Sequence, residues 1–180
     1  MQILRIFDAQ NYDISWKRVK REAVRAIIFK GDQIALVKCG KEGYYKFPGG
    51  GMEPNETHAQ ALVRETLEET GLKIVPQSIR GFGTLIEKRR SIYGECEIFE
   101  QHSHYYFADV EAESAVCRPD AYEAELEYHL EYAGLETAWK ADVALGNNYE
   151  SAFLVREAFI LELLMHKAGM AVGGKQVSCQ

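Results

Sequence analysis

The sequence predicts an α/β fold in which a mixed β-sheet lies between helices. Three observations support this class. Strand-like apolar segments precede residue 50, further strand-like segments follow residue 72, and a helical segment of about fourteen residues separates the two groups. A strong amphipathic helix over residues 149–167 then closes the chain. Strands on both sides of a central helix, followed by a final helix, are typical of a sheet covered by helices.

Before the central helix, the sequence predicts a hairpin and a short strand. Residues 18–29 contain a continuous apolar run, and the Gly31-Asp32 pair that follows is a turn signal. We expect the return strand at residues 34–37 and a short strand at residues 44–47. Residues 1–15 alternate only weakly, and they predict either an extra strand or a contact with a partner.

After the central helix, the expected elements are strands at 72–75, 78–88 and 101–110, a last strand at 127–132 and a short helix at 135–144. Residues 91–100 contain Gly94 and predict a hairpin loop, and residues 111–122 predict a second loop. Gly169 ends the final helix. The sequence therefore predicts a single domain over residues 1–170 and a flexible tail over residues 171–180.

The composition excludes several classes of protein. The chain has 180 residues, of which 47% are hydrophobic and 27% charged, as is ordinary for a globular domain. Its net charge is −6 and it has no long basic stripe, which argues against nucleic-acid binding. It has no apolar run of membrane-spanning length and no signal-peptide core. Its four cysteines show no metal-ligand spacing, so we expect free thiols and a cytoplasmic protein.

The central segment begins with a glycine turn and continues as a helix rich in glutamate. Residues 49–51 are all glycine, Asn55 is the expected N-cap, and Gly71 stops the helix. Glu65, Glu68 and Glu69 follow the i, i+3, i+4 spacing and share one face, while apolar residues occupy another.

Three close carboxylates repel one another unless they are solvated or bind a cation. Hard divalent cations prefer oxygen ligands, and Mg²⁺ also binds substrate phosphates. Backbone groups of the glycine turn lie near the start of the helix, where a metal-bound phosphate can approach. The segment therefore indicates chemistry that combines a metal ion with a phosphate.

This segment resembles the motif of the Nudix hydrolases, G-x5-E-x7-R-E-U-x-E-E-x-G-U, where U is aliphatic. Eight positions match at the required spacing: Gly50, Glu56, Arg64, Glu65, Glu68, Glu69, Gly71 and Leu72. The one departure is Thr66, where the family has an aliphatic residue. Because Thr66 falls on the buried stripe, we expect it to affect packing more than catalysis. The resemblance implies the Nudix α/β/α sandwich.

The resemblance also implies an activity and a set of site residues. The activity is hydrolysis of a nucleoside diphosphate derivative by attack of water on phosphorus, with magnesium or manganese as cofactor. By matched position, Glu65, Glu68 and Glu69 are metal ligands, and the carbonyl of Gly49 or Gly50 is a further candidate ligand. Arg64 would orient a glutamate, Glu56 would assist less directly, and Glu65 is one candidate for the general base.

Other candidate residues come from outside the motif. Many family members add a carboxylate from a late loop, and Glu123 and Glu125 are the candidates here. Arg25 lies on a strand that can face the site and is a candidate phosphate ligand. Tyr44 and Tyr45 are candidates for stacking on a base, and only one of them can face the site; we assign Tyr45 to the substrate.

Several alternatives stay open. A nucleotide-sensing module that binds without cutting would use the same fold, although this chain keeps every motif glutamate. An isomerase on the same scaffold would need a cysteine at the site, and Cys39 and Cys96 are the candidates. His102 and His104 share one strand face, as metal-ligand pairs can, but the sequence indicates no third ligand. The identity of the nucleotide is open, and the apolar N-terminal segment makes a homodimer a reasonable expectation.

Overall fold

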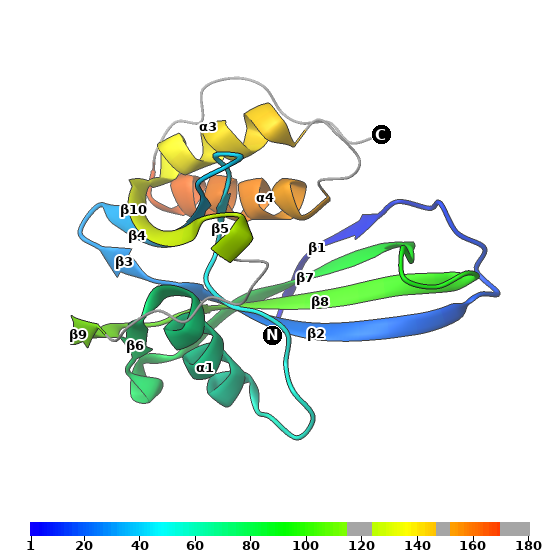
Figure 1. Cartoon of the computed structure of the whole chain (residues 1–180), viewed down its shortest axis with the longest axis horizontal. Coiled ribbons are helices and arrows are strands. Elements are labelled where there is room, and N and C mark those ends of the chain that lie inside the picture. The colour runs from blue at the N-terminus through cyan, green and yellow to red at the C-terminus, as the bar shows by residue number, and fades with distance from the viewer. Residues whose placement is uncertain (115–123, 147–151, 170–180) are drawn as a thin grey trace.

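The computed structural model of the protein describes residues 1–114, 124–146 and 152–169. The expected distal carboxylate Glu123 and the expected tail at 171–180 lie outside these ranges. Figure 1 shows the arrangement of the elements, with the α1 helix on one side of the strands and the α3 and α4 helices on the other. The bounds of these helices are His58–Thr70 for α1, Leu135–Leu145 for α3 and Ala152–Lys167 for α4.

The largest sheet contains four long strands in the order β1-β7-β8-β2. Their bounds are Ile3–Asp8 for β1, Lys17–Ile27 for β2, Arg80–Arg90 for β7 and Glu97–Phe107 for β8. Strands β7 and β8 are antiparallel, whereas β1 pairs with β7, and β2 with β8, in parallel. The sheet is therefore mixed, as the sequence predicts.

Shorter strands complete the fold. A second sheet has the order β10-β4-β3, and β5 pairs with the free edge of β4, while β6 pairs with β9. The bounds are Phe29–Lys30 for β3, Gln33–Cys39 for β4, Tyr45–Lys46 for β5, Leu72–Ile74 for β6, Val110–Ser114 for β9 and Tyr128–Gly134 for β10. A short 3-10 helix spans Pro76–Ser78.

The alternation of side chains along β2 divides the core into two layers. Val24 and Ala26 pack in one hydrophobic cluster with Leu62 of α1. Ile27 belongs to a second cluster, which includes Ile160 and other residues of α3 and α4. Because successive side chains of a strand point to opposite faces, β2 contributes to both layers. The α/β/α sandwich is thereby confirmed.

Some local expectations differ from the structure. The N-cap of α1 is Thr57, not Asn55: Thr57 forms a reciprocal capping box with Gln60, and Asn55 has a left-handed φ of 68° in the preceding turn. Strand β8 begins at Glu97, inside the expected hairpin loop, because its ladder with β7 continues to the pair Arg90 and Ile98. Strand β9 occupies part of the second expected loop because it pairs with β6.

Candidate active site

The segment that leads into the glycine turn is held by buried carboxylates from three different helices. The amides of alternate residues each donate to one carboxylate: Tyr45 to Asp142 Oδ1 at 2.8 Å, Phe47 to Glu157 Oε2 at 2.9 Å, and Gly49 to Glu69 Oε2 at 2.8 Å. These three acceptors come from α3, α4 and α1 respectively. Since buried amides need partners, the three helices together fix the path of this segment.

The opposite edge of the same segment is bonded to strand β2. Val24 N donates to Gly50 O at 3.0 Å, and Ala26 N donates to Pro48 O at 2.8 Å. Gly49 has a φ of 132°, and a Cβ built there would lie 2.2 Å from Val24 O. Only glycine fits this position, because both its backbone conformation and the close approach of β2 exclude a side chain.

Arg64 joins three of the motif carboxylates. Its guanidinium donates to Glu56 through Nε at 2.8 Å and Nη2 at 2.8 Å, and its Nη1 lies 2.7 Å from Glu65 Oε1 and 3.2 Å from Glu68 Oε2. A further bond from Nη2 reaches Gly51 O at 3.2 Å. The hydrogen bond from Arg64 lowers the pKa of Glu56 to about 2, so this carboxylate is ionised at neutral pH. Arg64 therefore sets the spacing of the motif side chains, as the resemblance implies.

The three glutamates with metal-ligand positions in the motif have different surroundings. The exposed fraction of the side chain is 49% for Glu68, 16% for Glu65 and 6% for Glu69. Glu69 accepts from Gly49 N and pairs with Lys46 Nζ at 2.8 Å. Burial raises the pKa of Glu69 to about 7, against the opposing effect of Lys46 and Arg25. Glu69 therefore supports the glycine turn, while Glu65 and Glu68 are the more accessible pair.

The surroundings of Glu65 fit a small cation. A Cβ at Gly50 would lie 2.1 Å from Glu65 Oε2, so the Glu65 carboxylate occupies the space of a side chain there and packs directly against the glycine turn. Glu65 and Glu68 share one Arg64 nitrogen, which brings their oxygens to the same side of the helix. Carboxylate oxygens and a nearby backbone carbonyl are the donors that Mg²⁺ prefers. Glu65, Glu68 and the Gly50 carbonyl thus form a suitable donor set, with Glu69 turned towards the backbone.

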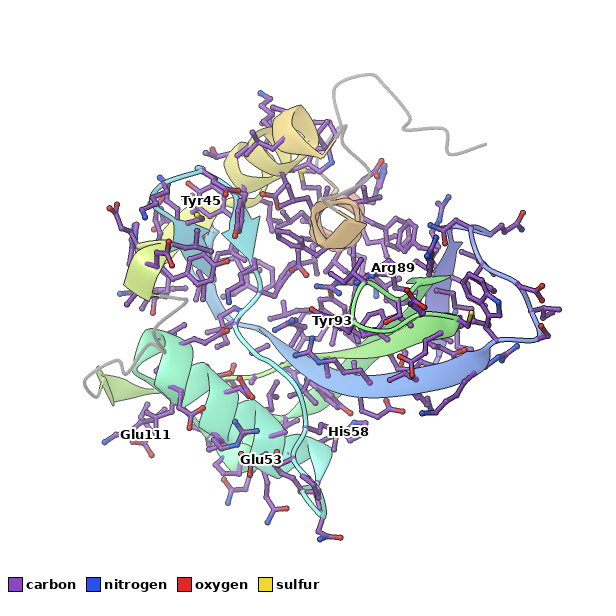
Figure 2. All side chains as sticks on the ribbon, turned by 45° about the vertical axis from the view of Figure 1, so that its right-hand side comes forward. Tyr45, Glu53, His58, Arg89, Tyr93 and Glu111 are labelled. Atoms are coloured by element: carbon purple, nitrogen blue, oxygen red, sulfur yellow. The ribbon has the colours of Figure 1, made fainter. Side chains whose placement is uncertain are left out.

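A cavity of about 1360 Å³ lies on the face of the large sheet opposite α1. Its walls carry several cationic side chains: Arg21, Arg25, Lys46, Arg89, Arg90 and Arg156. Figure 2 shows Arg89 and Tyr93 on this side of the sheet, above β2, with His58 below it. Lys46 connects this cavity to the motif, because it lines the cavity and pairs with Glu69. Glu87 and Glu95 also line the cavity, and Glu87 pairs with Arg89 and Arg156. The lining still carries more cationic than acidic side chains, which favours a polyanionic ligand.

Two arginines of β2 face the cavity beside the glycine turn. Arg25 is buried, and its Nε has no hydrogen-bond partner within residues 1–114, 124–146 and 152–169. Arg21 lies within 3.1 Å of the position of a Cβ on Gly51. Burial lowers the pKa of Arg21, and the neighbouring charges of Arg25 and Arg156 lower it further. This concentration of positive charge next to the motif favours the binding of phosphate oxygens.

The structure places the remaining candidates as follows. Tyr45 does not line the cavity, because its ring is buried and its hydroxyl donates to Glu131 at 2.7 Å; Tyr44 lines it instead. Glu125 is an exposed side chain. Neither isomerase candidate lines the cavity: Cys39 is buried and bonded to the backbone carbonyl of Leu126, and Cys96 is exposed.

Sequence reasoning identified Arg25 as a candidate phosphate ligand but missed Arg21 and Arg156 of the cavity walls. Arg21 lies four residues before Arg25 on β2, so the two side chains share one face of the strand. The strand period of two therefore predicts that Arg21 faces the same side as Arg25. Arg156 lies in α4 and is distant in the sequence, so its position depends on how the helix docks.

Within the described residues, no helix is long and apolar enough to cross a membrane.

Comparison with known proteins identifies the motif and the fold together. The family model of the NUDIX domain matches residues 19–145. A stretch of 38 residues is 53% identical to an 8-oxo-dGTP diphosphatase of Proteus vulgaris, covering 21% of this chain and 34% of that protein. A stretch of 56 residues is 41% identical to a CTP pyrophosphohydrolase of Escherichia coli K12, covering 29% of this chain and 42% of that protein.

A solved NUDIX hydrolase structure from Nitrosomonas europaea has the same fold. It superposes with a TM-score of 0.55 at 18% identity, over 89% of this chain and 100% of that chain. The curated relatives are matched over less than half of their own length. The similarity is thus distributed over the whole fold but is strong in sequence only over short stretches.

Proposed function

Because the chain belongs to the Nudix family, we propose that it is a metal-dependent hydrolase that cleaves the diphosphate linkage of a nucleoside triphosphate or nucleoside diphosphate derivative. The observation that carries the proposal is the position of Glu65 and Glu68. Both carboxylates approach Arg64 beside a glycine turn, next to a cavity with cationic walls. This arrangement supplies acidic metal ligands and positive charge at adjacent places.

Different residues of the chain have different roles in the proposed reaction. Glu65, Glu68 and the Gly50 carbonyl would hold a divalent ion, with Mg²⁺ or Mn²⁺ as the candidates. When bound, the ion neutralises diphosphate oxygens and lowers the pKa of a coordinated water. Arg64 holds Glu65 in place through a charge-assisted bond of 2.7 Å. Arg25 lines the cavity beside the glycine turn and is our candidate to bind a phosphate oxygen of the substrate.

The chemical step is a displacement at phosphorus. The oxygen of water forms a bond to phosphorus, the bridging P–O bond breaks, and the leaving phosphate or pyrophosphate carries away the bonding electrons. The proton of the water passes to a carboxylate of the site, for which Glu65 is our candidate because it is the less exposed of the accessible pair. Glu69 does not take this role, because both of its oxygens are engaged by Gly49 and Lys46.

The cavity limits the class of substrate. A nucleoside triphosphate is strongly anionic, and the arginines of the wall offset the overall negative charge of the chain. Tyr93 is largely exposed at the cavity wall, and Phe99 lies beneath the guanidinium of Arg89 at 4.5 Å. These flat groups can stack on a base. The 8-oxo-dGTP diphosphatase and the CTP pyrophosphohydrolase that match short stretches of this chain are named for nucleoside triphosphates, which is one of the two substrate classes that we propose.

A nucleotide screen with Mg²⁺ tests the proposal. The purified chain is incubated with nucleoside triphosphates, oxidised nucleoside triphosphates and nucleotide sugars, and the release of phosphate and pyrophosphate is measured. We expect Mg²⁺-dependent turnover that Glu68→Gln lowers by at least about 100-fold, since it removes a metal ligand whose effect is made in the transition state.

Glu136→Gln is the matched control for this substitution. Glu136 is a helical glutamate of similar exposure and is also paired with a cation four residues away, but it lies on α3 outside the cavity. It should leave turnover unchanged. Full activity of the Glu68→Gln variant would remove the metal assignment, and nucleotide binding without turnover by the wild-type chain would favour the sensing module instead.

A further inference from the structure

A second group of metal-ligand side chains lies on the face of the sheet that carries α1. Glu22 of β2 and His102 and His104 of β8 each offer one ligand atom, and these atoms lie within 4.8 Å of one another. Within the residues that the structure describes, this is the one group of three or more such residues that meets this spacing. The two histidines share a strand face, as the sequence indicates, and the parallel β2–β8 pairing supplies the third residue opposite His102.

The hydrogen bonds of the two imidazoles fix which nitrogen faces Glu22. His102 Nε2 lies 2.8 Å from Glu100 Oε1, and the other nitrogen, Nδ1, lies 3.8 Å from Glu22 Oε1. A neutral His102 that donates to Glu100 therefore directs a lone pair at the Glu22 carboxylate. The 3.8 Å separation is too long for a hydrogen bond but leaves room for a shared cation.

His104 is held in a similar way. Its Nδ1 lies 2.9 Å from the hydroxyl of Thr84, and its Nε2 lies 2.7 Å from Glu22 Oε2. His104 Nε2 thus donates to Glu22, a hydrogen bond that a bound ion would replace, whereas His102 Nδ1 faces Glu22 without a hydrogen bond. The bonds of the two imidazoles to Thr84 and Glu100 are outer hydrogen bonds of the kind that orients histidine ligands in metal sites.

The three side chains are also partly shielded from water. Their exposed fractions are 18% for His102, 13% for His104 and 34% for Glu22. The ring of His58, in the first turn of α1, packs on His104 with a centroid separation of 4.4 Å.

We propose that Glu22, His102 and His104 bind a divalent transition-metal ion at a site separate from the motif carboxylates, and that this ion is zinc. Two imidazoles and one carboxylate suit zinc, whereas Mg²⁺ prefers oxygen ligands. None of the three residues lines the cavity, and His58 lies on the opposite face of the sheet from Arg89 and Tyr93 (Figure 2). A fourth position stays open to water. Lys20 Nζ pairs with Glu22 Oε1 at 2.6 Å, and this exposed side chain would have to leave that oxygen for the ion to bind.

The site connects metal binding to the glycine turn. The carbonyl of Glu22 accepts from Met52 N at 3.0 Å, and Ala23 forms a bridge with Gly51. An ion on the Glu22 side chain therefore ties β2 to β8 at the point where β2 holds the end of the turn. We expect the ion to stabilise the folded chain, because it binds a geometry that the unfolded chain lacks.

Zinc titration of the full chain tests this proposal. The metal-free protein is titrated with ZnCl₂ by calorimetry, and its thermal midpoint is measured with and without zinc, with MgCl₂ as the comparison ion. Cys96→Ser serves as the background, because an exposed thiol can bind zinc by itself. We expect one zinc ion per chain, a higher thermal midpoint with zinc, and an affinity that His102→Gln lowers by at least about tenfold.

Two control variants make the result specific. His129→Gln removes an exposed histidine that also lies near a glutamate, and it should bind zinc as the background does. Glu68→Gln should lose turnover but keep zinc binding, so the failure of one site is distinguishable from the failure of the other. Equal zinc affinity of the His102→Gln and His129→Gln variants, or loss of zinc binding in Glu68→Gln, would overturn the proposal.

If the His102→Gln variant does not fold, a spectroscopic measurement on protein with all three ligands intact still tests the proposal. Co²⁺ replaces zinc in the background protein, and we expect the intense visible absorption of a four-coordinate ion without thiolate charge-transfer bands. An octahedral spectrum, or a spectrum with thiolate bands, would exclude the assigned ligands.

Discussion

Two pairs of acidic side chains flank the segment that leads into the glycine turn, and the two pairs have different roles. Asp142 and Glu157 are fully buried, and each accepts a backbone amide of the strand that leads into the glycine turn. Glu65 and Glu68 lie at the other end of this segment, are partly exposed, and are bonded to Arg64. The first pair fixes the backbone, and the second pair supplies the metal ligands that we propose. The comparison shows that burial and hydrogen-bond partners, not residue type, separate support from chemistry.

The largest expected effect comes from the buried pair. Glu157 bonds both Phe47 N and the guanidinium of Arg156, which is itself buried. In Glu157→Gln, the amide oxygen can still accept from Phe47 N, but the negative charge next to Arg156 is lost. Glu87 is then the one carboxylate left that pairs with Arg156 among the described ion pairs. Breaking a buried ion pair by removing one partner costs about 3–5 kcal/mol. We expect a loss of this size in the free energy of unfolding, measured by urea denaturation.

The exposed pair gives the opposite result in the same measurement. Glu68→Gln should change the free energy of unfolding by less than about 1 kcal/mol, because exposed ion pairs contribute little. The two variants thus separate stability from turnover. If Glu68→Gln destabilised the fold as much as Glu157→Gln, the distinction between the pairs would be lost.

A second prediction uses the pH dependence of the buried pair. Burial raises the pKa of Asp142 from its ordinary value of 3.8 to about 8, and the charge of Glu157 adds to this, while the bond from Tyr45 N opposes it. The unfolded chain releases this proton near pH 4, so the stability that the proton contributes is complete below that pH. It is lost progressively as the pH rises to about 8. The Asp142→Asn variant has no proton to lose.

The difference between the two proteins should therefore grow with pH. From pH 6 to pH 8, the free energy of unfolding of Asp142→Asn should rise relative to wild type by roughly 2–3 kcal/mol, at most about 1.4 kcal/mol per pH unit. Thermal denaturation at several pH values measures it. Asp32→Asn, at an exposed turn, is the control and should show no such trend. A constant difference for Asp142→Asn would show that this carboxyl is ionised throughout.

Sequence reasoning located the exposed pair but not the buried one. The spacing of Glu65 and Glu68 is a local pattern on one helix, and local patterns can be read from the chain directly. Gly71 as the end of α1 was confirmed for the same reason, since its left-handed φ of 73° is a local demand. Asp142 shares α3 with Glu136, and Glu157 shares α4 with Glu162. Which acid of each helix is buried against a backbone amide depends on how the helix docks, and the local sequence does not show that.

Contacts between distant strands set the limit of prediction. The sequence predicts a mixed sheet and a central helix, and both were confirmed. It does not show that residues 17–27 pair in parallel with residues 97–107, which is what brings Glu22 to His102. The cationic cavity has the same origin, because its residues come from β2, β7 and α4. Register and docking depend on the whole core, and no local window contains that information.

The smallest expected effect concerns a buried polar group that lacks the partners of Asp142 and Glu157. Thr66 is fully buried on α1, and its Oγ1 has no hydrogen-bond partner in the described part of the chain. A buried hydroxyl without a partner costs about 1–3 kcal/mol, part of which is recovered when a methyl group of similar size replaces it. Thr66→Val should therefore raise the free energy of unfolding by about 1 kcal/mol without altering turnover. Urea denaturation of this variant measures the gain, with the exposed Thr57→Val as a contrast, because Thr57 caps α1 and its loss should destabilise the chain. A destabilised Thr66→Val variant would mean that the hydroxyl has a partner, and Thr66 would then belong with the buried acids as a group that supports the fold.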